Sequence, residues 1–397
     1  MVDLSSARIE DQVRHHPLIA LHVDPPAVPC PAGFDCDFLG VRTRRAFYSG
    51  MVAEGLLSAP PPSHPSFDDE YFEWVDIFEA VDQADETFVM IELGAGYGRW
   101  CARAAAAIRR KGNCRYQLVA VEAEPVHFRW MREHFRDNDI NPGDHELIWA
   151  AVDAQPGFVP FWVGAADHWY GQAIAVDHPL PMPDAGTRRR LKARSVLGRP
   201  PGTTSDERTV VWIPCVTLTD VLAPHRRVDL IDLDLQGAEY DVLASAIDLV
   251  NERVRRLHIG THSPQIEQQL RELLSSHGWQ KINDYPGQTT AQTPYGPIQF
   301  GDGVQTWVNP VVGGFAADPF ERRKTETAPG KRPHGKLLRS LRARVKELRQ
   351  QNRALKRRNA ELRDRIRSRD ERVQALQGSR AWPVRLVERW FSKRGGS

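Results

Sequence analysis

The chain has 397 residues, of which 41% are hydrophobic and 26% charged, so it can bury one large core and is neither fibrous nor disordered throughout. It contains no run of eighteen apolar residues, and its N-terminus lacks a basic segment followed by an apolar one. We therefore expect neither a membrane span nor a signal peptide, and a cytoplasmic location. The five cysteines include no C-x-x-C pair, which predicts reduced thiols and no zinc cluster.

The net charge of +2 hides an uneven distribution along the chain. Residues 336–377 hold fifteen Lys or Arg and five Asp or Glu, and residues 378–397 hold five and one, so residues 1–335 carry about −12. The basic C-terminal part is either a solvated helix face or a tail that contacts anionic lipid, nucleic acid or a phosphate-bearing substrate.

Residues 1–67 form an N-terminal extension with a Pro-rich connector at 59–65 and a candidate hairpin or edge strand at 34–44. A helix is predicted over 68–81. Its apolar residues recur at the three-and-four spacing of one helical face: Tyr71, Trp74, Val75, Phe78 and Val81.

Strands and helices alternate from residue 88 to residue 308, within a predicted domain at 68–312. The expected strands are 88–93, 116–124, 146–153, 228–235, 255–262, 279–285 and 297–308, and the expected helices follow the first glycine turn and cover 125–135, 240–250 and 264–277. Near-continuous apolar strands between helices predict an α/β fold whose parallel sheet is covered on both faces. The segment 164–209 shows no periodicity and is predicted to be a lid or an insertion.

The composition changes at residues 313–336, which we interpret as a linker to a coiled coil at 337–377 and a basic amphipathic tail at 378–397. The heptad positions a are Leu338, Val345, Asn352, Asn359, Ile366 and Val373, and the positions d are Leu341, Leu348, Leu355, Leu362, Arg369 and Leu376. Aliphatic residues at a with leucine at d, and paired asparagines at a, predict a parallel homodimer.

A glycine turn lies where the first strand meets its helix. Gly94, Gly96 and Gly98 let the backbone approach a ligand beside a helix N-terminus. Glu92 precedes them and would repel a pyrophosphate, but it suits a ligand that carries an ammonium group. Glu122 ends the second strand, where a carboxylate accepts both ribose hydroxyls of an adenosine.

Three further residues are candidates for ligand contacts. Asp153, after the third strand, either accepts from an adenine amine or caps a turn. Trp169 and Tyr170 either stack on the substrate or adenine, or anchor the long loop.

The glycine turn with its two acids resembles that of class I S-adenosylmethionine-dependent methyltransferases, whose Rossmann-like fold has a seven-stranded mixed sheet. Within that class, residues 216–222 and 228–243 resemble the signature of the FkbM family. Asp229, Asp234, Gly237 and Glu239 match the signature, whereas Thr219, Asp232 and Gln236 stand in place of its Asp, Lys and Glu.

The resemblance implies S-adenosylmethionine as cofactor and transfer of a methyl group to a hydroxyl of a sugar or a similar natural product. Asp234 and His262 are the candidates for the group that removes the hydroxyl proton. Asp232 with Asp234 suggests a metal pair, but residues i and i+2 of a strand share a face without any metal, so none is expected.

The segment 378–386 is similar to a tail found behind coiled coils in bacterial cell-surface glycosyltransferases. It would direct the activity to a surface glycan or its lipid-linked precursor and place the protein peripherally at the inner membrane surface; the alternative is a simple amphipathic stub.

Two other functions compete with methyl transfer. One is a nucleotide-dependent oxidoreductase, against which the glycine spacing and Glu92 argue, and the other is a non-enzymatic basic coiled-coil scaffold or nucleic-acid binder. No nucleic acid is expected, because the basic residues are spread along the heptads.

Overall fold

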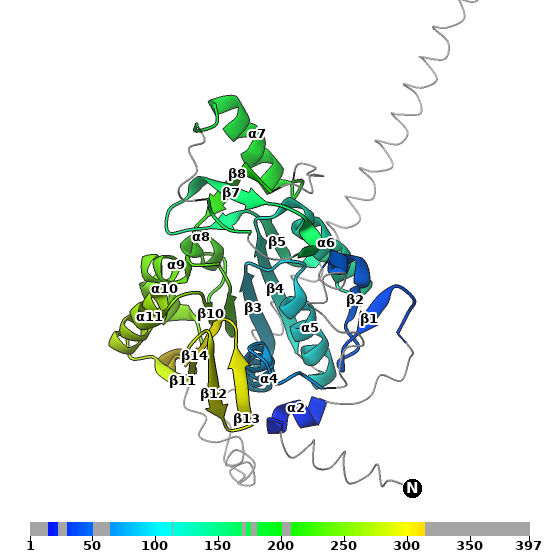
Figure 1. Ribbon diagram of the computed structural model, residues 1–397, viewed down its shortest axis with the longest axis vertical. Coiled ribbons are helices and arrows are strands. Elements are labelled where there is room, and N and C mark those ends of the chain that lie inside the picture. Colours follow the sequence, from blue (N-terminus) through cyan, green and yellow to red (C-terminus); the bar gives the residue numbers. More distant parts are fainter. Residues whose placement is uncertain are drawn as a thin grey trace, which may run out of the picture. The chain divides into compact units, whose positions relative to one another are not determined.

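The computed structural model describes residues 15–22, 30–50, 64–112, 114–168, 172–175, 181–200 and 208–313 (Figure 1). The predicted coiled coil and tail, most of the Pro-rich connector, and Trp169 with Tyr170 lie outside the described residues. None of the described helices is both long and apolar enough to cross a membrane.

A seven-stranded mixed sheet forms the centre of the fold (Figure 1). Its strands are β3 (Thr87–Leu93), β4 (Arg115–Glu122), β5 (Glu146–Trp149), β9 (Leu230–Leu233), β10 (Arg256–Thr261), β11 (Gln280–Tyr285) and β14 (Gly303–Val308). The order is β11-β14-β10-β9-β3-β4-β5, and β14 runs antiparallel to both of its neighbours while the central strands are parallel. This order confirms the expected sheet of a class I methyltransferase.

Helices cover both faces of this sheet. One face carries α4 (Tyr71–Gln83), α5 (Arg99–Lys111) and α6 (Pro125–Asp137), and the other carries α8 (Leu218–Leu222), α9 (Glu239–Ser245), α10 (Ile247–Arg253) and α11 (Pro264–Ser276). Side chains of β3 alternate between the two cores, with Phe88 and Met90 on the α4 face and Ile91 and Leu93 on the other. The predicted helix at 68–81 is confirmed as α4, and all five of its periodic residues are buried.

The long segment after β7 (Gly157–Val163) is more structured than its sequence indicated. It contains the helix α7 (Ala185–Val196), which begins at the side-chain cap of Asp184 on the Thr187 amide. None of its residues is buried, which explains why no apolar periodicity marked it. The predicted strand 146–153 is divided between β5 and β6 (Ala151–Val152), and β6 joins β7 and β8 (Thr209–Val216) in a separate three-stranded sheet.

Two other predicted elements are also divided. The helix expected at 240–250 breaks at Ala246 between α9 and α10. The strand expected at 297–308 is divided into β13 (Gly296–Phe300) and β14. β13 pairs with β12 (Thr289–Thr293) outside the central sheet. Smaller elements complete the described fold: α2 (Pro17–His22), the 3-10 turns Arg45–Phe47, Pro142–Asp144 and Ala166–His168, and α12 (Pro310–Gly313).

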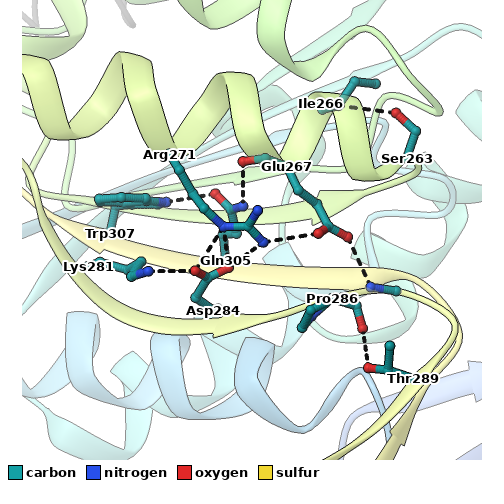
Figure 2. Close-up of polar contacts among 11 residues, drawn as sticks. Ser263, Ile266, Glu267, Arg271, Lys281, Asp284, Pro286, Thr289, Gln305 and Trp307 are labelled. Carbon is teal, nitrogen blue, oxygen red and sulfur yellow. Dashed lines mark hydrogen bonds and ion pairs between the residues drawn. The ribbon is translucent and has the colours of Figure 1, made fainter.

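Polar contacts fix α11 against β11, β14 and the turn that follows β11 (Figure 2). Arg271 of α11 donates to both carboxylate oxygens of Asp284, and Lys281 donates to the same carboxylate at 2.6 Å. Glu267 accepts from Arg271 and from the Gly287 amide, both at 3.0 Å. These bonds attach α11 to β11 and to the turn that follows it.

The prediction of five reduced cysteines is wrong for two of them. Cys30 and Cys36 form a disulfide whose Cα atoms lie 5.7 Å apart. Gly33, at a φ of +84°, turns the chain so that Cys30 returns beside Cys36 at the end of β1 (Phe34–Cys36), which pairs with β2 (Arg42–Arg44) as the expected hairpin. A spacing of six residues carried no signal for this closure. Among the described residues, Cys101, Cys114 and Cys215 are free.

Candidate active site

The glycine turn joins β3 to α5 and touches the end of β9. Gly94 has a φ of +81°, and a Cβ there would lie 1.9 Å from the carbonyl oxygen of Asp234. A Cβ on Gly98 would meet Phe135 of α6 at 2.7 Å. The turn therefore needs glycine at both positions, and it brings Gly96 and Asp234 to the same edge of the sheet, as the sequence predicted.

Glu92 serves the turn itself. Its carboxylate accepts from the amides of Trp100 at 3.2 Å and Cys101 at 2.8 Å, in the first turn of α5. Burial raises the pKa of Glu92, although the amide donors oppose that shift. The contact stabilises the helix N-terminus, and the predicted role of Glu92 toward the ammonium group of a ligand stays a prediction.

Glu122 closes β4 directly opposite the turn. One carboxylate oxygen accepts from the Gly96 amide and the other from the Glu124 amide, both at 2.6 Å. Burial raises the pKa of Glu122 to about 8 in spite of these donors. Each carboxylate oxygen has two acceptor sites, so both can accept a further hydrogen bond from a ligand hydroxyl.

A cavity opens between the turn and the second sheet, and we call it the glycine-turn cavity. Its lining includes Gly94, Gly96, Glu122, His127, Val152, Phe161, Gln172, Ile174, Asp234 and Gln236. Asp153 is not part of this lining, and its carboxylate accepts from the Ala154 amide at 2.7 Å. Neither Phe161 nor Ile174 was predicted, because Phe161 lies on β7, a strand that the sequence did not indicate, and Ile174 lies in the segment 164–209, which shows no periodicity.

A second, larger cavity adjoins the first one on the α4 face, and we call it the acidic cavity. It is lined by Asp69, Glu70, Glu73, Asp232 and Asp302, among others, with Arg99 and His258 as the basic side chains. Gly94, Gly96, Asp234 and Gln236 line both cavities. A ligand in one cavity therefore lies next to a ligand in the other, and Asp234 stands between them.

Asp234 and His262, the two candidate bases, lie close together, and Glu239 completes a cluster around the histidine. His262 Nδ1 lies 2.9 Å from a Glu239 oxygen, and Nε2 lies 3.3 Å from an Asp234 oxygen. Burial opposes a charged imidazole, but the two carboxylates outweigh it and raise the pKa of His262 to about 10. Partial burial likewise opposes ionisation of Asp234, but His262 and Gln236 lower its pKa. Near neutral pH the cluster holds a carboxylate beside an imidazolium.

Fold and site thus define a class I methyltransferase domain. Residues 92–280 match the family model described as the methyltransferase FkbM domain. A curated protein of Jannaschia sp. (strain CCS1), named "Putative methyltransferase", is 26% identical over 216 residues, which cover 54% of this chain and 70% of that protein. The family match confirms the resemblance drawn from the sequence and argues against the oxidoreductase alternative.

Two solved structures are similar to the chain at low identity. Precorrin-6y C5,15-methyltransferase from Geobacter metallireducens is 13% identical, with a TM-score of 0.30 over 59% of this chain and 86% of that one. A human methyltransferase 10 domain containing protein is 11% identical, with a TM-score of 0.31 over 66% and 95%. The order of the seven strands, and not either of these similarities, identifies the fold.

Proposed function

We propose that this domain transfers the methyl group of S-adenosylmethionine to a hydroxyl of a sugar or glycan. The observation that carries the proposal is the pair of adjoining cavities, with Asp234 lining both. Methyl transfer needs three things of a protein: alignment of donor and acceptor, exclusion of water, and removal of a proton from the attacking hydroxyl.

The glycine-turn cavity fits the cofactor. Glu122 would accept from the ribose hydroxyls, and the apolar side chains of Val152, Phe161 and Ile174 would enclose the adenine. The bound cofactor supplies an activated methyl group on a sulfonium. Gly94 keeps the wall toward Asp234 thin, because any side chain there would collide with the Asp234 carbonyl.

The acidic cavity fits a neutral, hydroxyl-rich acceptor. Carboxylates accept hydrogen bonds from hydroxyls, and the excess of acids over bases in the lining disfavours a phosphate or carboxylate placed there. Asp234 is the base in this proposal, because its pKa is lowered while His262 is already protonated. His262 then acts as a positioning residue that holds Asp234 in its ionised form.

The test separates binding from chemistry. Asp234→Asn keeps the shape of the junction but removes the proton acceptor, so turnover should fall about 100-fold or more while S-adenosylmethionine affinity changes little. Asp241→Asn, on the exposed side of α9, is the matched control. Equal turnover in the Asp234 variant and the control would reduce Asp234 to a structural residue.

We further propose that the C-terminal heptads at 337–377 pair two copies of the chain, and that the basic tail contacts an anionic membrane surface on which a glycan precursor is assembled. What supports this is the leucine spacing and the charge of +10 over residues 336–377. Light scattering of the full chain tests the dimer, and sedimentation with vesicles of neutral or anionic lipid tests the surface contact.

A further inference from the structure

A row of three ionisable side chains crosses the sheet below the junction of the two cavities. Asp232 of β9 pairs in register with Glu92 of β3 on one side and with His258 of β10 on the other. Residues in register on parallel neighbours point to the same face, here the face covered by α4. Glu73 of α4 meets this row, and its carboxylate oxygen lies 4.0 Å from His258 Nε2.

A contact with Asp76 fixes the orientation of the His258 ring. Its Nδ1 lies 2.7 Å from Oδ2 of Asp76, which also accepts from Thr306 at 2.6 Å, while Oδ1 of Asp76 accepts from Arg256 at 2.7 Å. With Nδ1–H donating to Asp76, the lone pair of Nε2 points away from Asp76 toward Glu73. A histidine held by a carboxylate on one nitrogen is the usual arrangement of a metal ligand.

Asp232 supplies the independent sign of a ligand. Its side chain is only 5% exposed, it lines the acidic cavity, and its Oδ1 has no hydrogen-bond partner. A buried carboxylate oxygen without a partner is costly, because the charge has lost its water and gained nothing in exchange.

We propose that Glu73, Asp232 and His258 bind a divalent cation of the first transition row at the floor of the acidic cavity. One ligand atom from each residue lies within 4.8 Å of the other two. Ligand atoms about 2.1 Å from one cation stand about 3 to 3.5 Å apart, so a side-chain rotation of Glu73 would close the set. One imidazole with two carboxylates suits Mn²⁺ or Zn²⁺ better than Ca²⁺.

The cation would bind the hydroxyl-bearing acceptor. This step, unlike the cation site itself, rests on the proposed function. Three protein ligands leave coordination positions open toward the cavity, and a hydroxyl bound there becomes more acidic. The proton would then pass to Asp234, which lines the same cavity. This assignment departs from the expectation of no metal, since Glu73 comes from a helix far from Asp232 in the sequence.

The neighbouring cluster of Asp234, Glu239 and His262 has the same residue types but a different arrangement. There the histidine lies between two carboxylates, so both nitrogens are engaged and its charge balances one acid. One Glu239 oxygen also accepts from the Leu235 and Gly237 amides at 3.0 Å. A protonated His262 offers no lone pair, and we assign the cation to the Glu73, Asp232 and His258 set instead.

The experiment measures cation binding by the full chain, without donor or acceptor, after treatment with EDTA and gel filtration. Titration calorimetry with Mn²⁺ should show one site, and Asp232→Asn should weaken it more than about 100-fold, since loss of a second-shell partner alone costs about 10- to 100-fold. The Asp232→Asn variant should fold, because Oδ1 of Asp232 makes no hydrogen bond that the substitution could remove. Asp302→Asn, which removes one acid from the same cavity, is the control.

Glu73→Gln gives an independent check at the partly exposed edge of the site and should also weaken binding more than about 100-fold. The proposal is overturned if the wild-type chain binds neither Mn²⁺ nor Zn²⁺, or if both variants bind as the wild type does. It is also overturned if Asp302→Asn weakens binding equally, because the effect would then reflect overall negative charge. None of these outcomes depends on methyl transfer, so failure here leaves the proposed function standing.

Discussion

Glu122 gives the sharpest test of the cofactor site, because its protonation should be coupled to ligand binding. Burial holds the pKa of Glu122 at about 8 in the ligand-free fold. Ribose hydroxyls donate hydrogen bonds, so they favour the ionised carboxylate, and affinity should follow the ionised fraction. That fraction rises from about 3% at pH 6.5 to about 75% at pH 8.5, which predicts an increase in affinity of about 25-fold.

The assay is calorimetric titration across this pH range with 5′-methylthioadenosine, which carries the ribose and adenine but no group that titrates between pH 6 and 9. Glu122→Gln should bind more weakly at pH 8.5 and show no rise with pH. The same raised pKa makes the contribution of Glu122 to folding stability largest below its unfolded pKa and lost as the pH rises through about 8. A flat affinity profile for the wild type, or an equal slope in the variant, would refute the ribose contact.

Three further predictions concern the turn, the sheet and the tail. Gly94→Ala places a Cβ 1.9 Å from the Asp234 carbonyl oxygen and should lower the free energy of unfolding by about 2–4 kcal/mol. Gly112→Ala, also at positive φ but in open space, should lower it by only about 1 kcal/mol. Chemical denaturation compares the two variants, and equal losses would contradict the steric explanation. Asp284→Asn removes a carboxylate whose pKa is lowered by Arg271 and Lys281 despite burial. It should lower the free energy of unfolding by about 1 kcal/mol at pH 7, and by progressively less as the pH falls below about 4. A loss of stability that persists in acid would exclude an ionic origin. Truncation after Gly335 should leave a monomer that still binds the cofactor, as light scattering and calorimetry can show, and a monomeric full chain would contradict the dimer.

The central sheet could be predicted because its signals are local. Apolar runs bounded by turn residues marked β3, β4, β9 and β10, and the glycine turn with Glu122 identified the edge of the sheet at which the glycine-turn cavity lies. Each signal lies within a few residues of the element it defines, so tertiary packing reinforced the pattern and did not override it.

The parts that could not be predicted depend on distant segments. Glu73 stands on the polar side of a helix whose apolar spacing was the only readable pattern, and only the pairing of β9 with β10 brings His258 beside Asp232. The disulfide likewise depends on a turn at Gly33 that a six-residue spacing does not announce. The sequence named His262 as a candidate base, but the two carboxylates that raise its pKa become visible only in the fold.

The central claim is that a hydroxyl held in the acidic cavity receives the methyl group. The most direct measurement incubates the full chain with methyl-labelled S-adenosylmethionine and surface glycans from a strain that lacks the protein, and then locates the label by mass spectrometry and NMR. We predict label in methyl ethers of sugar hydroxyls, absent with Asp234→Asn. Label on nitrogen or carbon, or no transfer by a chain that binds the cofactor, would contradict the claim.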